Sequence, residues 1–160
     1  MTNPPICAAC GGKCCKTIPG IYWPSDIVPL TADRIAAMIR ADLACIDWWE
    51  GPIEPEAPSR CLFLRGRAVN DHGAITGSRG GQCTQLTEQG CRLEWEARPR
   101  VCRELMPGAT LGDDCVVPEG LDKRSCAATW LPYQALLKAV VVAERQNSPP
   151  DARLALFVAL

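Results

Sequence analysis

The chain has 160 residues, about the length of one domain, and 48% of them are hydrophobic, so it can bury a single core. Its 17 Lys and Arg side chains nearly balance 18 Asp and Glu side chains, which argues against a nucleic-acid binder and against a polybasic membrane surface. We see no apolar run long enough to span a membrane and no secretory signal, so we expect a cytoplasmic protein.

The first predicted helix covers residues 32–46. Thr31 has the side chain of an N-cap, and Asp33 would lie in the first helical turn. Apolar residues follow at helical spacing: Ile35, Met38, Ile39, Leu43 and Ile46. Cys45 would therefore lie on this helix, where the simplest interpretation is a small buried side chain.

Residues 47–79 are expected to form a linker or variable insertion. The stretch 51–59 holds three prolines and is typical of a surface loop. Residues 61–64 could begin a short strand, and residues 66–81, rich in Gly, Asn, Asp and Ser, are typical of a hairpin or a mobile loop.

The second half of the chain is predicted to be mostly helical. Pro99 suits the first turn of a helix over 99–106, and Asp122 or Ser125 could cap another. A further helix would run to about residue 146, and a last short helix would begin at 148–151. We therefore expect one small domain over residues 1–160, mainly α and irregular, whose long loops are organised by a cysteine-ligated metal centre.

Cysteine is the unusual residue in this composition, with 11 in 160. In a chain without an export signal, many cysteines indicate metal or redox chemistry more than disulfides. The spacing Cys7-x2-Cys10-x3-Cys14 is typical of metal ligands carried on a tight turn. Cys15 follows directly, and because adjacent side chains diverge, we expect Cys14 and Cys15 to serve different metals or one of them to be a structural thiol.

Four cysteine-containing segments follow one another in a specific order: Cys7-x2-Cys10-x3-Cys14-Cys15, Cys83-Thr84-Gln85-Leu86, Gly90-Cys91-Arg92-Leu93 and Arg98-Pro99-Arg100-Val101-Cys102-Arg103. This order and spacing resemble the YkgJ-type cysteine-cluster proteins, a zinc- or iron-chelating family related to the domain in flagellin lysine N-methylases. Residues 23–27, just after the first cluster, also resemble a family segment. The resemblance covers residues 7–46 and 80–140 and leaves residues 47–79 and the last 15 residues unexplained.

The resemblance implies a bacterial metal-binding protein with eight cysteine ligands. On the matching positions these are Cys7, Cys10, Cys14, Cys15, Cys83, Cys91, Cys102 and Cys126. Cys115 is the rival of Cys126 for the last position, and Cys45 and Cys61 match no family position. Eight thiolates suit an iron–sulfur cluster, which we favour slightly, or Zn²⁺, in a structural or an electron-transfer role with a protein or redox partner.

Other functions remain open at this point. The resemblance to the flagellin methylases would allow a protein-modifying enzyme or enzyme component, although no catalytic residue is identified and nothing resembles an S-adenosylmethionine site. A disulfide-stabilised scaffold is disfavoured by the odd number of cysteines. A thioredoxin-like redox pair at Cys7 and Cys10 is disfavoured because no βαβ pattern surrounds it. His72 is the single histidine and lies in a polar segment, where we expect it to be solvated.

Overall fold

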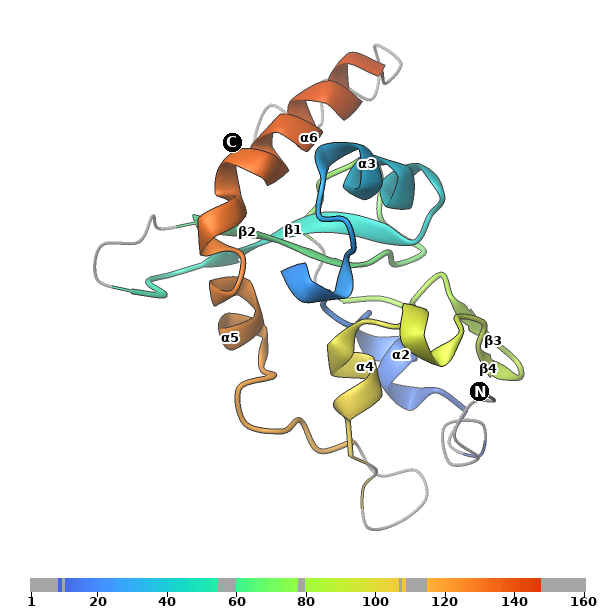
Figure 1. Cartoon of the computed structure of the whole chain (residues 1–160). Coiled ribbons are helices and arrows are strands. Elements are labelled where there is room, and N and C mark those ends of the chain that lie inside the picture. Colours follow the sequence, from blue (N-terminus) through green and yellow to red (C-terminus); the bar gives the residue numbers. More distant parts are fainter. Residues whose placement is uncertain are drawn as a thin grey trace.

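The computed structural model describes residues 9, 11–54, 60–77, 80–106, 108 and 115–147. At its centre lies an antiparallel hairpin of β1 (Ala44–Glu50) and β2 (Arg60–Gly66), in which Ile46 pairs with Leu64. Two longer helices, α3 (Ala32–Arg40) and α6 (Gln134–Asn147), lie on one side of this hairpin (Figure 1).

Shorter elements lie on the other side of the hairpin in Figure 1. They are α2 (Lys13–Thr17), α4 (Arg100–Glu104), α5 (Lys123–Ala128) and the small pair of β3 (Leu86–Thr87) with β4 (Gly90–Cys91). Three 3₁₀ turns connect the elements: η1 (Pro24–Asp26), η2 (Trp95–Ala97) and η3 (Leu131–Tyr133). The cysteine-containing segments of the second half of the chain therefore lie on the same side of the hairpin as α2.

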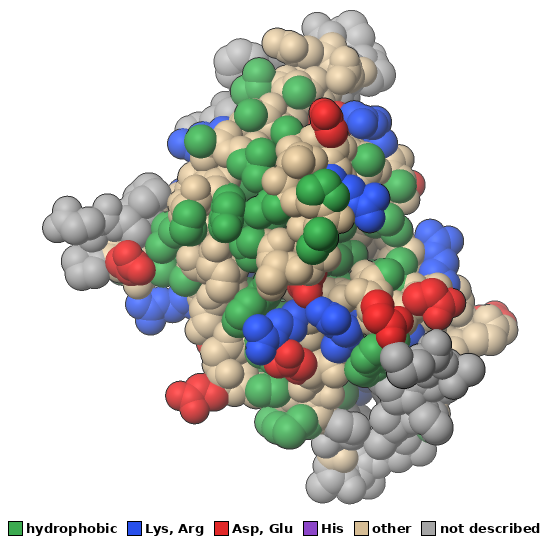
Figure 2. Space-filling view, viewed as in Figure 1, with side chains coloured by type: hydrophobic (Ala, Val, Ile, Leu, Met, Phe, Trp, Pro, Cys, Tyr) green, Lys and Arg blue, Asp and Glu red, His purple; other side chains and the backbone are tan. Residues whose placement is uncertain are grey.

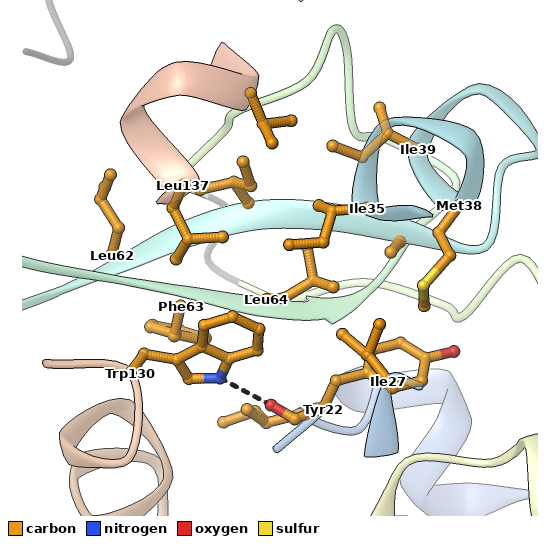
Figure 3. Packing of buried hydrophobic residues seen from close by; sticks show 14 of the residues in the cluster. Tyr22, Ile27, Ile35, Met38, Ile39, Leu62, Phe63, Leu64, Trp130 and Leu137 are labelled. Atoms are coloured by element: carbon orange, nitrogen blue, oxygen red, sulfur yellow. Dashed lines mark hydrogen bonds between the residues drawn. The ribbon is translucent and has the colours of Figure 1, made fainter. Parts of the chain in front are cut away.

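The hydrophobic core is built on both faces of the hairpin. Because side chains alternate along a strand, Leu62 and Phe63 of β2 point to opposite sides (Figure 3). Phe63 packs near Trp130, whose indole Nε1 donates a hydrogen bond of 2.8 Å to the backbone oxygen of Tyr22. Burying a side chain of the size of Phe63 stabilises a fold by about 1.5–3 kcal/mol.

Local signals in the sequence predicted the helix caps well. The Thr31 hydroxyl accepts the Arg34 N–H, which confirms the N-cap of α3. Of the two candidates for the cap of α5, Asp122 is the N-cap and its carboxylate accepts the Ser125 N–H. The helix predicted to run to about residue 146 is α6, which ends at Asn147.

The prediction of one helix over residues 32–46 is wrong in its second half. α3 ends at Arg40, and Asp42 then adopts a left-handed backbone with φ of 56°. The chain reverses there and residues from Ala44 onward form β1, so Cys45 lies on a strand. The apolar residues at 43 and 46 fit a helical period by coincidence, and pairing with β2 overrides that local pattern.

The segment 47–79 contains most of the central hairpin, whereas we expected a linker. Within it, the short strand predicted to begin at residues 61–64 is confirmed as part of β2. The part after β2 is an ordered turn held by ion pairs, not a hairpin. Asp71 accepts two hydrogen bonds from Arg65, at 2.6 and 3.0 Å, and a third from the Ala68 N–H. Asp47 on β1 binds Arg65 Nε at 2.7 Å, so one guanidinium joins the hairpin to the turn.

The expected fold class, mainly α with loops organised by a cysteine-ligated metal centre, is therefore wrong. The molecule has a β hairpin between layers of helices, and its loops are held by backbone hydrogen bonds and buried ion pairs. Within the described part of the chain, no group of three or more His, Cys, Asp or Glu side chains is placed to hold a metal ion. The short helix expected from residue 148 lies outside the described residues.

None of the helices in the described ranges has the length and apolar character needed to cross a membrane.

Candidate functional site: a cysteine-lined pocket

Six cysteines from separate segments line one pocket of about 60 Å³ on the side of the hairpin opposite α3 and α6. They come from α2, the loop before β3, β4, α4 and the segment before α5: Cys14, Cys15, Cys83, Cys91, Cys102 and Cys115. Tyr22 and Gln85 also contribute to the wall. A pocket with this many thiols is the most unusual chemical feature that the described residues offer.

The helix α2 presents the first two of these cysteines. Gly11 and Gly12 precede it with φ of 64° and 68°, a left-handed conformation that glycine adopts without strain. The sulfur atoms of Cys14 and Cys15 lie 3.9 Å apart. Our expectation that the adjacent thiols of Cys14 and Cys15 diverge is therefore not met.

Cys83 is held against α2 by the backbone. Its N–H donates to the backbone oxygen of Cys15 at 2.7 Å, and its own backbone oxygen accepts the Leu86 N–H at 3.1 Å. The sulfur of Cys83 also accepts a hydrogen bond from the backbone of Gln85. Cys91 follows on β4, paired with Leu86 on β3, so the turn between these strands brings both thiols to the pocket.

Cys102 lies in the first turns of α4, as the sequence predicted from Pro99, although this helix ends at Glu104. The helix is anchored by Asp26 of η1. One carboxylate oxygen of Asp26 accepts the Arg100 N–H at 2.9 Å, and the other accepts from Arg103 at 2.6 Å. Asp26 thus caps α4 from a distant segment, which fixes the position of Cys102.

Lys, Arg, Asp and Glu side chains gather together over α4 on the face of the molecule shown in Figure 2. Arg100 contributes to this group through an ion pair with Glu104 and by stacking over the Trp23 ring at 4.2 Å. These contacts account for the charged residues around Cys102 in the sequence.

Burial and repulsion from neighbouring sulfurs raise the pKa of Cys83 and Cys102 and so oppose their ionisation. Burial raises the pKa of Cys102, and the nearby sulfurs of Cys14 and Cys83 raise it further. The pKa of Cys14 is lowered to about 6, mainly by a hydrogen bond from Cys15, and that arrangement raises the pKa of Cys15. A positive charge in the pocket would favour several thiolates together.

The pocket contains five of the eight cysteines predicted as ligands, namely Cys14, Cys15, Cys83, Cys91 and Cys102. It also contains Cys115, the rival for the last position. Cys7 and Cys10 lie outside the described residues.

Cys126 lies elsewhere, in the hydrophobic core on α5. Its sulfur accepts a hydrogen bond of 3.2 Å from Trp23 Nε1, and its thiol donates to the backbone oxygen of Leu121 at 3.4 Å. Both contacts are those of a packed structural thiol. The resemblance-based preference for Cys126 over Cys115 therefore finds no support in its position.

Cys45 and Cys61 lie in the hairpin and are fully buried. The Cys45 thiol donates to the backbone oxygens of Ile46 and Ala74, and burial raises its pKa to about 12. The Cys61 thiol donates to the Ala127 oxygen at 3.3 Å, and burial raises its pKa to about 11. Both behave as small core side chains. The nine cysteines in the described ranges are all free thiols.

Sequence reasoning missed several residues that shape the pocket. Gly20, Tyr22 and Gln85 line it, and Asp26 anchors the helix that carries Cys102. The signal for Asp26 was weak, since it rested only on the resemblance of residues 23–27 to a family segment. Gly20 and Tyr22 carry no local pattern that points to a thiol about 80 residues away in the chain.

The chemistry of this donor set fits a thiophilic metal, because the described residues of the pocket wall include six thiols and no imidazole or carboxylate. Two sulfurs bound to one tetrahedral Zn²⁺ would be about 3.8 Å apart, given Zn–S bonds of about 2.3 Å. The 3.9 Å between Cys14 and Cys15 matches that separation. A third sulfur is not placed to share an ion with them in the described residues.

The fold and the pocket together define a small α+β protein with a cysteine-lined cavity. Comparison with family models, with curated proteins and with solved structures found no match. The resemblance to the YkgJ-type family therefore stays a prediction.

Proposed function

We propose that this chain is a metal-binding protein whose cysteine pocket takes an iron–sulfur cluster or Zn²⁺. One observation carries the proposal: thiols from five separate segments line a single pocket. Buried free thiols usually occur singly as small apolar side chains, as Cys45 and Cys61 do here. Packing alone does not explain why six thiols are grouped at one cavity, because small apolar side chains would fill the same space equally well.

The proposed ligands are the six pocket cysteines, with Cys7 and Cys10 as further candidates from the predicted Cys7-x2-Cys10 spacing. Cys115 takes the place that the resemblance gave to Cys126. An iron–sulfur cluster would supply one-electron redox chemistry, whereas Zn²⁺ would supply a fixed positive charge. The chain's own residues would hold the group, exclude water through Tyr22 and the apolar wall, and donate backbone N–H groups to the sulfurs of Cys83 and Cys102.

The role of such a centre is structural or electron-transferring, and in the second case a protein redox partner is implied. The enzymatic alternative rests on the family resemblance alone. The cysteine pocket supports metal binding independently of that resemblance.

The test is purification of the full chain without oxygen, followed by metal analysis and visible absorption. Brown protein with iron and sulfide would support the cluster, and colourless protein with stoichiometric zinc would support Zn²⁺. The Cys102→Ser variant should lose metal because the serine hydroxyl is not deprotonated near neutral pH, whereas Cys45→Ser should keep it. Metal-free protein with disulfides among the pocket cysteines, or equal metal loss in both variants, would overturn the proposal.

A further inference from the structure

We propose that Gly20 is a positioning residue for Cys102, and that its missing side chain is what allows the Cys102 sulfur to face the pocket. This inference rests on the proposed metal-binding function, because positioning matters for the sulfur as a ligand. Gly20 and Cys102 are far apart in the sequence, yet the two residues line the same two cavities.

The space beside Gly20 is filled by the thiol. A Cβ atom placed on Gly20 would overlap the Cys102 sulfur, while the next nearest atoms, on Pro99, would lie at an ordinary 3.5 Å. Gly20 is not among the glycines with a positive φ. Since an alanine could adopt this backbone without strain, the requirement for glycine is steric and concerns one sulfur atom.

The backbone of Gly20 cannot easily move away. Its oxygen accepts the Gly66 N–H at 2.8 Å, and the next residues continue this pairing along β2, with the Tyr22 N–H donating to the Leu64 oxygen at 2.9 Å. The segment from Gly20 to Tyr22 is thus attached to the central hairpin, the most buried part of the molecule.

The other partner is equally fixed. α4 carries Cys102, and its first backbone N–H and Arg103 are bound by Asp26. Because Asp26 lies only six residues after Gly20, one stretch of chain sets both the wall beside the sulfur and the position of the helix that carries it. Gly20 also donates a backbone hydrogen bond to the Cys102 sulfur, so the two residues are in direct contact.

A methyl group at position 20 would therefore displace the sulfur and leave the surrounding backbone in place. Outer residues that orient metal ligands typically change metal affinity by about 10–100-fold when they are altered. We expect Gly20→Ala to weaken metal binding within that range while the protein stays folded. Because the Gly20→Ala variant still contains Cys102, any loss of metal affinity reports a change in the position of the Cys102 sulfur.

The experiment compares the full-length wild type, Gly20→Ala and Gly120→Ala by titrating Co²⁺ into reduced, metal-free protein. Gly120 is the matched control because a Cβ there would meet nothing within 4 Å, although its φ of 80° makes the substitution costly to the backbone. Gly20→Ala should bind Co²⁺ more weakly and give a smaller thiolate-to-cobalt absorption. Gly120→Ala should match the wild type in both measurements.

A second measurement separates positioning from general damage and does not need metal. Thermal unfolding is compared for Gly20→Ala in the wild-type and the Cys102→Ala backgrounds. The overlap is removed with the sulfur, so Gly20→Ala should lower the melting temperature only where Cys102 is present. An equal decrease in both backgrounds would overturn the inference, as would wild-type Co²⁺ affinity and absorption in Gly20→Ala.

The two proposals fail differently. Wild-type protein that binds no metal would overturn the proposed function, while the unfolding comparison would still decide whether Gly20 makes room for Cys102.

Discussion

Arg65 and Asp71 form a two-point ion pair inside the molecule, with Nη1–Oδ2 at 2.6 Å and Nη2–Oδ1 at 3.0 Å. Both side chains are almost completely buried. The pair joins the end of β2 to the turn that follows it, and Asp47 on β1 completes the network. This network holds the loop that leads from the hairpin toward the cysteine pocket.

Asp71→Asn should destabilise the protein strongly. The variant keeps the shape of the side chain but removes the carboxylate charge that pairs with Arg65 from the turn, and breaking a buried pair costs about 3–5 kcal/mol. The measurement is the free energy of unfolding in urea. Glu104→Gln is the control, because its pair with Arg100 is exposed and should contribute less than about 1 kcal/mol. Similar small costs for both variants would contradict this account.

Much of the local structure could be predicted from the sequence, because it depends on neighbouring residues. Thr31 and Asp122 cap their helices through backbone N–H groups three residues ahead. A helix does begin beside Pro99, although Pro99 is its N-cap and was expected in its first turn. The helix predicted to run to about residue 146 is also confirmed, as α6.

The errors arose where distant partners decide the structure. Cys45 was predicted on a helix, but β2 pairs with its segment and makes it a strand. Asp71 lies in a stretch whose composition is typical of a mobile loop, and only its partner Arg65 explains why it is ordered. A charged partner in a folded interior leaves no local sequence signal.

The candidate site could be predicted only in part, because tertiary contacts between distant segments also determine it. Spacing and resemblance identified Cys14, Cys15, Cys83, Cys91 and Cys102, which the fold brings to one pocket. Cys126, which the resemblance also implied, lies in the hydrophobic core, whereas its rival Cys115 lines the pocket.

Alkaline pH should reveal the burial of Cys45. Burial raises its pKa from 9.0 to about 12, so the unfolded chain loses this proton first as the pH rises above 9. The resulting contribution to stability is complete below pH 9 and is lost between pH 9 and 12, by up to about 1.4 kcal/mol per pH unit.

The measurement is the free energy of unfolding of wild type and Cys45→Ala, at neutral pH and at about pH 10.5. The Cys45→Ala variant should lose less stability than the wild type over this interval, by about 2 kcal/mol. Parallel decreases in the two proteins would show that this thiol ionises as readily in the folded state as in the unfolded one.

Cys115→Ser and Cys126→Ser should have opposite effects. Cys115 lines the pocket, so its serine variant should lose metal with little change in stability. Cys126 is fully buried beside Trp23, so its serine variant should keep metal but lose about 1–3 kcal/mol if the hydroxyl finds no partner.

Both properties are measured on each variant, by metal analysis and by urea unfolding. Metal loss in Cys126→Ser together with full metal content in Cys115→Ser would restore the ligand set that the family resemblance implied.

Metal removal should loosen the pocket and leave the hairpin intact. The core of β1, β2, α3 and α6 is closed by apolar packing and by the Arg65 network, and the pocket cysteines are not part of that apolar cluster. A metal that binds only the closed pocket stabilises the elements that form it, and these elements can open without unfolding the rest.

Hydrogen exchange of the metal-loaded and the chelated protein, both kept reduced, measures this directly. We expect amides of α2 and α4 to exchange faster after chelation, because these short helices are held mainly through Cys83, Asp26 and the pocket itself. Amides of β1 and β2 should keep their protection, since Tyr22 and Trp130 still belong to the same buried cluster as Phe63 of β2. Loss of protection throughout the chain would show that the metal organises the whole fold, contrary to the arrangement of its core.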